Sequence, residues 1–214
     1  MIDKNPKADL ILQDHSVFQL WETCKSKKNI VLQNSLPCKY AAIVHGSELD
    51  FHITTAQEGS EMTMMLVCPI IDEKPLTINL HLDLKHNHCA INLHLVALVQ
   101  TNAKTTLNAT IVMQPHIQNA SAHLLEETVV LSPNVQVKSL PILDIHAKNI
   151  QASHGAKIYR LDNDKLFYLQ SKGLTRRQAQ ELLLHSYGER LFEDLALGEE
   201  DKHQLISDFL TFEA

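Results

Sequence analysis

Apolar and polar residues alternate in short segments along most of the chain between Ile30 and Leu169. Alternation with a period of two is typical of strands that bury one face. Turn-forming residues such as Gly46, Gly59 and Asn87 separate these segments. No helical segment long enough for a βαβ crossover interrupts them. The pattern therefore predicts an all-β body built from closely spaced strands.

The buried face changes between two neighbouring segments of this body. In TINLHLDLK the apolar residues Leu82 and Leu84 hold even positions, whereas Cys89 and Ile91 in CAINLHLVAL hold odd ones. The change falls across residues 85–88 and predicts a corner or a bulge, because a continuous strand cannot change its buried face. Short strands joined by tight corners fit either a sandwich or a β-solenoid. No clear repeat separates these two architectures.

Helical spacing replaces the alternation after Gly173. Thr175, with Gln178 three residues later, predicts an N-cap with a capping box. The apolar residues that follow share one helical face and are Ala179, Leu182, Leu183, Leu191, Phe192 and Leu195. Gly198 is expected to end this helix. A second amphipathic helix is predicted over 199–212, and the pair would either cap the β core or form a docking surface.

The chain is accordingly expected to have three parts. They are a short N-terminal segment over 1–29, a β core over 30–172 and a helical region over 173–214. One interpretation of the first part is a short helix that packs Leu20 and Trp21 on the body. In the core, KLFYLQ at 165–170 is expected to be a further strand.

Composition narrows the function classes. The formal net charge is −6, and no Lys/Arg cluster with interleaved aromatic residues is present, which argues against nucleic-acid binding. No apolar run approaches the length of a membrane span, and the N-terminus lacks the apolar core of a signal peptide, so the cytoplasm is the expected location. The four cysteines form no C-x-x-C pair, which indicates reduced, partly buried thiols rather than disulfides or a cysteine-only zinc site.

Motifs for familiar enzyme classes are missing. There is no G-x-S-x-G elbow, P-loop or dinucleotide fingerprint. The chain has 13 histidines, and several gather with a cysteine in one region: His81, His86, His88, His94 and Cys89. Such a set suggests a metal site and, with it, a metal-dependent enzyme. Corner and surface histidines are the favoured interpretation, because His86 and His88 fall at the expected corner while the other two flank the change of face.

His154 lies in NIQASHGAKIYRLDNDKLFYLQSKGL, at what reads as a break between two strands. A glycine after the histidine permits a backbone conformation that turns the imidazole outward. A neutral imidazole is a common metal ligand. From the pattern alone His154 is either an ordinary turn residue or a ligand.

The segment from Leu143 to Leu191 carries a family resemblance. LDIHAKNIQASHGAKIYRLDNDKLFYLQSKGLTRRQAQELLLHSYGERL resembles the C-terminal signature of the SufB/SufD family of iron–sulfur cluster assembly proteins, with the SufD branch nearer. The matching residues are Leu143, Ile145, Ser153, His154, Gly155, Ala156, Asp162, Phe167, Tyr168, Leu169, Ser171, Gly173 and Ala179. A looser similarity extends back to Leu82 and includes LKHNHCAINLHL.

The resemblance implies a right-handed parallel β-helix with a C-terminal helical region. Family members pair through their β-helices, SufD with SufB, and bind the ABC-type ATPase SufC through the helical region. By this resemblance His154 would face a transient iron–sulfur cluster at the subunit interface. The docking helix for the ATPase would present Arg176, Arg177, Leu182 and Leu183.

Departures from the family pattern suggest a shortened, divergent member. Ala152 stands where a cysteine often precedes the Ser-His pair, so this chain would offer a nitrogen ligand and no sulfur there. The leading hypothesis is a non-catalytic scaffold subunit that pairs with a SufB-like protein, or with itself, and docks a SufC-like ATPase. The alternative is a β-helical interaction module that binds such partners without holding a cluster. Which, if any, of the cysteines handles sulfur is left open.

Overall fold

The computed structural model describes most of the chain. The described residues are 2–3, 9–13, 17–21, 25–44, 46, 48–70, 75–100, 104–132, 134–193, 195 and 198–210. No side chain is described for 2–3, 9, 17–21, 25–26 and 208–210.

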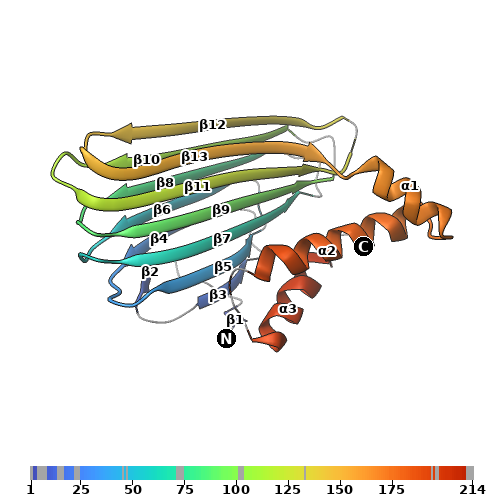
Figure 1. Ribbon diagram of the computed structural model, residues 1–214, viewed down its shortest axis with the longest axis horizontal. Helices are drawn as coiled ribbons and strands as arrows, with labels where there is room; N and C mark the ends of the chain where they lie inside the picture. Colours follow the sequence, from blue (N-terminus) through green and yellow to red (C-terminus); the bar gives the residue numbers. More distant parts are fainter. Residues whose placement is uncertain are drawn as a thin grey trace.

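The described strands form two sheets, and successive strands alternate between them (Figure 1). Sheet A has the order β1 (Ile2–Asp3), β3 (Val17–Trp21), β5 (Cys38–Val44), β7 (Glu61–Ile70), β9 (Ala90–Val99), β11 (Gln118–Val130), β13 (Asn149–Arg160). Sheet B has the order β2 (Asp9–Leu12), β4 (Lys25–Leu32), β6 (Glu48–Thr55), β8 (Leu76–Leu84), β10 (Lys104–Met113), β12 (Gln136–Ile145). Neighbouring strands pair in parallel, for example β8 with β10 and β9 with β11. The chain is therefore a parallel β-helix, and the sandwich alternative is excluded.

Residues of the same kind occupy matching register positions in successive coils. Inside sheet B, for example, Ile30, Ile53, Leu82 and Ile111 lie in one row of register partners, and all four are buried. Burial of each such side chain contributes about 1.5–3 kcal/mol relative to exposure. The rows from both sheets meet in one central apolar core.

The corner between the two sheets has the same backbone conformation in successive coils. Gly59, His88 and Asn119 all have positive φ, at 73°, 58° and 52°. The Gly59 N–H donates to the carbonyl of Asn87 and the His88 N–H to that of Gln118, so each corner stacks on the next. This corner contains the expected change of buried face between residues 85 and 88, and that prediction is confirmed.

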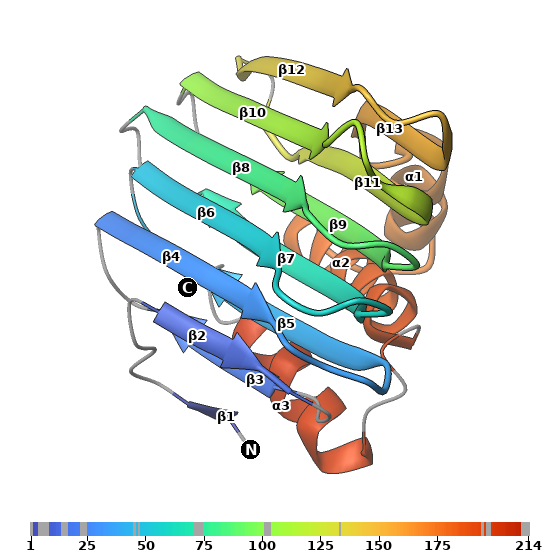
Figure 2. The ribbon, with the colours of Figure 1, turned by 90° about the vertical axis from the view of Figure 1, so that its left-hand side faces the viewer.

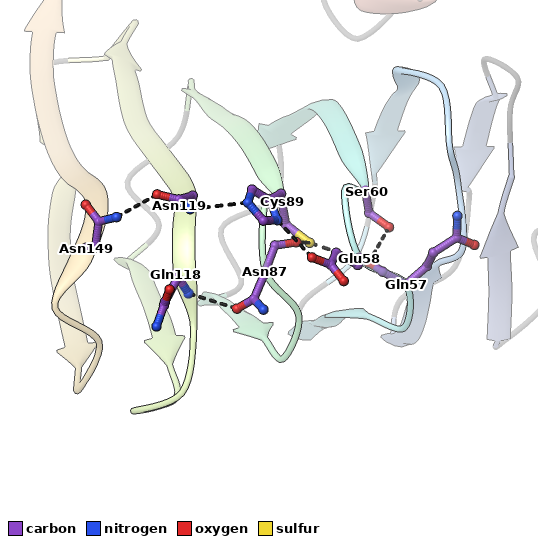
Figure 3. A network of polar contacts seen from close by, with 9 residues as sticks. Gln57, Glu58, Ser60, Asn87, Cys89, Gln118, Asn119 and Asn149 are labelled. Atoms are coloured by element: carbon purple, nitrogen blue, oxygen red, sulfur yellow. Dashed lines mark hydrogen bonds and ion pairs between the residues drawn. The ribbon is translucent and has the colours of Figure 1, made fainter.

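Polar side chains form a ladder along the same corners (Figure 3). The Asn149 amide donates to Asn119 Oδ1 at 2.6 Å, and Asn119 Nδ2 lies 3.2 Å from His88 Nε2. The other ring nitrogen of His88 lies 2.8 Å from Glu58 Oε1. His88 is thus occupied as a corner residue, as the sequence pattern favoured.

The outer faces of the two sheets differ in polarity. Strands β8 and β10 of sheet B alternate between buried and half-buried residues, as expected for a sheet with one solvated face. In sheet A, the second half of β7 is buried on both faces. A second apolar cluster explains this difference, because helices cover the outer face of sheet A (Figure 2).

Three helices follow the strands: α1 (Asn163–Ser171), α2 (Arg176–Glu193) and α3 (Glu199–Leu210). Thr175 and Gln178 form the predicted capping box, since the Thr175 N–H donates to Gln178 Oε1 at 2.9 Å and the Gln178 N–H donates to Thr175 Oγ1 at 3.2 Å. Ala179, Leu191, Phe192 and Leu195 are buried as predicted. Leu182 is 48% exposed, and Leu184 and Tyr187 are buried in addition, so the expected face is confirmed except around Leu182 and Leu183. Among the described residues, no helix is both long and apolar enough to cross a bilayer.

Three sequence predictions about these boundaries were wrong. The expected strand at 165–170 belongs to α1, because Asp162 caps the helix by accepting from the N–H groups of Asp164 and Lys165. Gly198 does not end α2; its carbonyl accepts from the Lys202 N–H at the start of α3. The described parts of 1–29 form strands, not a helix, because they add further coils to the two sheets.

A polar network joins three strands of sheet A next to α2. Glu127 of β11 accepts from Tyr159 of β13 at 2.7 Å and lies 2.8 Å from His94 Nε2 of β9. The hydrogen bond from His94 lowers the pKa of Glu127 to about 2, against the opposing effect of burial. Tyr159 also interacts with Tyr187 of α2, and burial raises the pKa of Tyr159 to about 12. The network therefore joins three strands, and its Tyr159 packs against the apolar cluster that includes α2 residues.

We expect this network to make stability depend on acid pH. Because the pKa of Glu127 is lower in the folded than in the unfolded chain, its carboxylate stabilises the fold at pH values above the unfolded pKa near 4.5. This stabilisation is lost as the pH falls toward 2. The difference in unfolding free energy between wild type and Glu127→Gln should therefore shrink by up to about 3 kcal/mol across that range. Denaturant unfolding at several pH values measures it. Glu200→Gln, an exposed change on α3, should show no such trend, and an equal trend in both variants would contradict the assignment.

The left-handed corner gives a second prediction. A Cβ on either Gly59 or Gly198 would meet no heavy atom within 4 Å, but only Gly59 of these two has positive φ. Gly59→Ala should therefore destabilise the fold by about 1 kcal/mol through backbone strain alone. Gly198→Ala should leave the unfolding free energy unchanged or slightly raised. Equal effects of the two substitutions would show that the corner is not strained.

Candidate functional site

Strand β13 runs without interruption from Asn149 to Arg160 and carries His154 at its centre. The predicted break at Ser153-His154-Gly155 was wrong, because all three residues pair in register with β11. The φ of Gly155 is not positive. A Cβ there would lie 3.4 Å from Leu125 Cδ1, at the border of an ordinary van der Waals contact.

The inner rows of sheet A change from apolar to polar at its last two strands, β11 and β13. One row runs through Met64, Leu93 and Leu124 and ends at His154. The neighbouring row runs through Leu66 and Leu95 and continues to Glu126. Both polar side chains therefore occupy positions that the preceding coils fill with aliphatic groups.

His154, Glu126 and Ser139 form a buried hydrogen-bonded group. His154 Nε2 lies 3.2 Å from Glu126 Oε1, and these side chains are only 3% and 1% exposed. Ser139 of β12 donates its hydroxyl to the other carboxylate oxygen, Oε2. The three residues come from β13, β11 and β12, so the group joins the two sheets at the end of the β-helix.

The pairing assigns the ring proton of His154 to Nε2, since an ionised carboxylate only accepts. Nδ1 then carries a lone pair, and it is buried without a hydrogen-bond partner in the described structure. An imidazole that donates one N–H to a carboxylate and keeps the other nitrogen free has the arrangement of metal-ligating histidines. The group can therefore offer one nitrogen ligand of fixed tautomer.

The site adjoins the open end of the β-helix. Strands β12 and β13 are the last of their sheets, so each has one edge without a neighbouring strand in the described chain (Figure 1). Large apolar side chains are exposed on these strands: Leu140, Ile142, Leu143 and Ile158. An exposed edge with apolar side chains is typical of a surface that pairs with another chain.

The histidines that cluster in the sequence do not converge in space. His86 Nδ1 lies 3.0 Å from the carbonyl oxygen of Thr55, and His94 binds Glu127 on the opposite sheet from His81. The predicted alternative of a metal-dependent enzyme using these residues therefore has no common site. His81 instead faces His52, with ring centroids 4.9 Å apart. The pKa of His52 is lowered, mainly by burial and secondly by the neighbouring His81.

The described cysteines are free, buried thiols: Cys38, Cys68 and Cys89. Burial raises the pKa of Cys68 to about 12, and burial also raises that of Cys89. Thiolate formation is therefore disfavoured at both positions. Cys24 lies outside the described residues.

The residues expected to dock an ATPase lie in α2 with different exposures. Arg176 and Arg177 are exposed in its first turn, and Arg177 pairs with Glu181 at 3.4 Å. Leu182 is exposed and Leu183 is half-buried.

Sequence reasoning missed Glu126 and Ser139, although a carboxylate among the alternating apolar residues of β11 was a visible signal.

Comparison with known proteins agrees with this architecture. The family model of the SUF system FeS cluster assembly, SufBD core domain, matches residues 11–187. The iron-sulfur cluster assembly protein SufD of Escherichia coli is 22% identical over 169 residues, which are 78% of this chain and 40% of that protein. A SufBD family protein of Synechocystis is 28% identical over 144 residues, or 67% and 32% of the two chains. Protein ABCI7, chloroplastic, of Arabidopsis thaliana is 27% identical over 135 residues, or 63% and 28%. The chain spans less than half the length of each of these relatives.

Removal of His154 should be costly unless Glu126 is neutralised as well. His154→Ala leaves a buried carboxylate with only the Ser139 hydroxyl, which should destabilise the fold by about 3–5 kcal/mol. The double variant His154→Ala/Glu126→Gln removes the charge and should be more stable than His154→Ala alone. Denaturant unfolding of wild type, both single variants and the double variant measures the coupling. Additive effects would mean that His154 and Glu126 do not interact.

Proposed function

Because the chain belongs to the SufBD core family of the SUF iron–sulfur cluster assembly system, we propose that it is a non-catalytic scaffold subunit in which His154 binds the nascent cluster. The cluster is the cargo of this assembly and is held transiently at a subunit interface. A partner subunit contributes the remaining ligands, since this chain has Ala152 in place of a cysteine before Ser153. Imidazole from one subunit complements thiolate and carboxylate from the other.

One observation carries the proposal. His154 ends an otherwise apolar inner row, donates Nε2–H to Glu126 and keeps Nδ1 without a partner. A core position of this kind destabilises the isolated chain, because burial of an unpartnered polar atom has a free-energy cost. A ligand role at the end coil explains why the polar residue occurs there and not one coil earlier, where the position is Leu124.

The partner in this proposal binds the open end of the β-helix. A SufB-like subunit, or a second copy of this chain, pairs with the free edges of β12 and β13 and covers the exposed Ile142 and Ile158. Burial of such apolar surface favours association by about 25 cal/mol per Å² before entropic costs. The cluster ligand then lies at the junction of two β-helices.

A SufC-like ABC-type ATPase is the second proposed partner and docks on α2. Arg176 and Arg177 provide exposed positive charge, and Leu182 provides an exposed apolar anchor. Leu183 completes the surface from its half-buried position. Because α2 packs on sheet A, ATP-driven movement of the ATPase reaches the β-helix through a rigid contact.

Anaerobic reconstitution tests the ligand role. The complex with SufB-like and SufC-like proteins is loaded with iron and sulfide, and cluster content is read from visible absorption and bound iron. His154→Ala/Glu126→Gln should lower cluster yield at least about tenfold relative to Glu126→Gln alone, because the two differ only in the ligand. Equal yields would exclude the ligand role and favour an interaction module without a cluster.

Charge reversal tests the docking role separately. Arg176→Glu/Arg177→Glu should abolish co-purification of the ATPase while leaving the paired β-helix subunit bound. Lys165→Glu/Lys172→Glu changes the charge equally on the adjoining α1 segment and should retain the ATPase. Loss of the ATPase in both variants would point to net charge, and retention in both would exclude this surface.

A further inference from the structure

Two histidines and an aspartate meet on the outer face of sheet B, outside the site described above. His52 of β6 and His81 of β8 are register partners, and Asp83 lies two residues beyond His81 on the same face. One ligand atom from each of the three lies within 4.8 Å of the others. In a tetrahedral zinc site neighbouring ligand atoms are about 3.3 Å apart, so the set closes by side-chain rotation of about 1.5 Å. His52 is exposed and free to rotate in that way.

Unused acceptors point to a missing occupant at this place. Asp83 Oδ2 pairs with Lys85 Nζ at 3.3 Å, but Oδ1 is buried and has no hydrogen-bond partner in the described structure. Thr54, the register partner of Asp83 on β6, also has a buried Oγ1 without a partner. Two adjacent buried oxygens without donors are unusual, since buried polar groups are nearly always satisfied. A cation bound at this place satisfies the free oxygen of Asp83.

The neighbouring polar side chains do not supply that donor. Asn79 Nδ2 donates to Asp50 Oδ1 at 2.6 Å, and Asn108 Nδ2 donates to Asn79 Oδ1 at 2.8 Å. These amides form their own ladder along the same face and leave the His-His-Asp group unfilled. The group is therefore distinct from the polar ladder beside it.

We propose that His52, His81 and Asp83 form a binding site for a divalent first-row transition metal ion of borderline softness, with Zn²⁺ as the reference ion. Two imidazoles and one carboxylate are the ligand set that such ions favour, whereas Mg²⁺ and Ca²⁺ favour all-oxygen sites. The three protein ligands leave at least one coordination position open to water.

Lys85 competes with the metal for Asp83. Its ammonium group pairs with the carboxylate from outside, where the side chain is half exposed. A nearby positive charge opposes cation binding. Lys85→Gln should therefore tighten metal binding, a gain that a merely structural His-His contact would not produce.

Metal titration of the tag-free, chelator-treated full chain tests the site. Co²⁺ is added and followed by visible absorption, and Zn²⁺ is then used to displace it. We expect one ion per chain, at least about tenfold weaker binding in His81→Ala and Asp83→Asn, and tighter binding in Lys85→Gln. Excess Mg²⁺ should not compete. Thermal unfolding of each apo variant is measured alongside, so that a loss of metal binding is attributed only to variants that remain folded.

Two control variants identify where the metal binds. His146 Nε2 lies 2.8 Å from Asp144 Oδ1, so this exposed His-Asp pair resembles the proposed site but lacks its second histidine. His146→Ala should therefore leave the affinity for the metal unchanged. His154→Ala/Glu126→Gln should also leave it unchanged, which separates this site from the proposed cluster ligand. Unaltered affinity in both His81→Ala and Asp83→Asn, or equal loss in His146→Ala, would overturn the proposal.

Discussion

Stacking of like residues at equal height is the constraint on which the rest of this structure depends. Each coil hydrogen-bonds to the next in parallel register, so an inner position is surrounded by the same position of the coils above and below. Polar side chains outside follow the same rule, with Asp50, Asn79 and Asn108 spaced 29 residues apart. A residue that departs from its row must therefore be satisfied by neighbours on the other sheet or by something beyond the chain.

The end of the β-helix, from β11 to β13, is where this rule leaves the most freedom. Glu126 and His154 interrupt aliphatic rows and satisfy each other, with Ser139 contributed by the opposite sheet. Strands β12 and β13 at this end have free edges and exposed apolar side chains. In the proposed function, ligand binding and subunit association therefore share one surface, because only the end of the β-helix can place a buried ligand within reach of a second subunit.

The sequence predicted the β body, the corner at 85–88 and the capping box, since each depends on residues close together in the chain. It did not reveal the repeat of the coils. Successive coils share the class of side chain at each position but not the residue itself, and the lengths of the corners differ by a few residues. Asp162 shows the limit of alternation, since one cap converted an apparent strand into α1. His52 and His81 are 29 residues apart in the chain, and only parallel register brings them together. Glu126 was visible as a carboxylate among the apolar residues of β11, but its pairing with His154 became apparent only once the register of β11 with β13 was known.

The second apolar cluster has a mechanical consequence. Leu184, Leu191 and Phe192 of α2 belong to one cluster with residues of β5, β7, β9 and β11. Lys39 of β5 also donates to the carbonyl oxygen of Leu195, just beyond α2, at 2.7 Å. The helix therefore acts as a strut across several coils at once. A pull applied to α2 is shared among many interstrand hydrogen bonds loaded together, so the coils should shift as one body rather than peel apart singly.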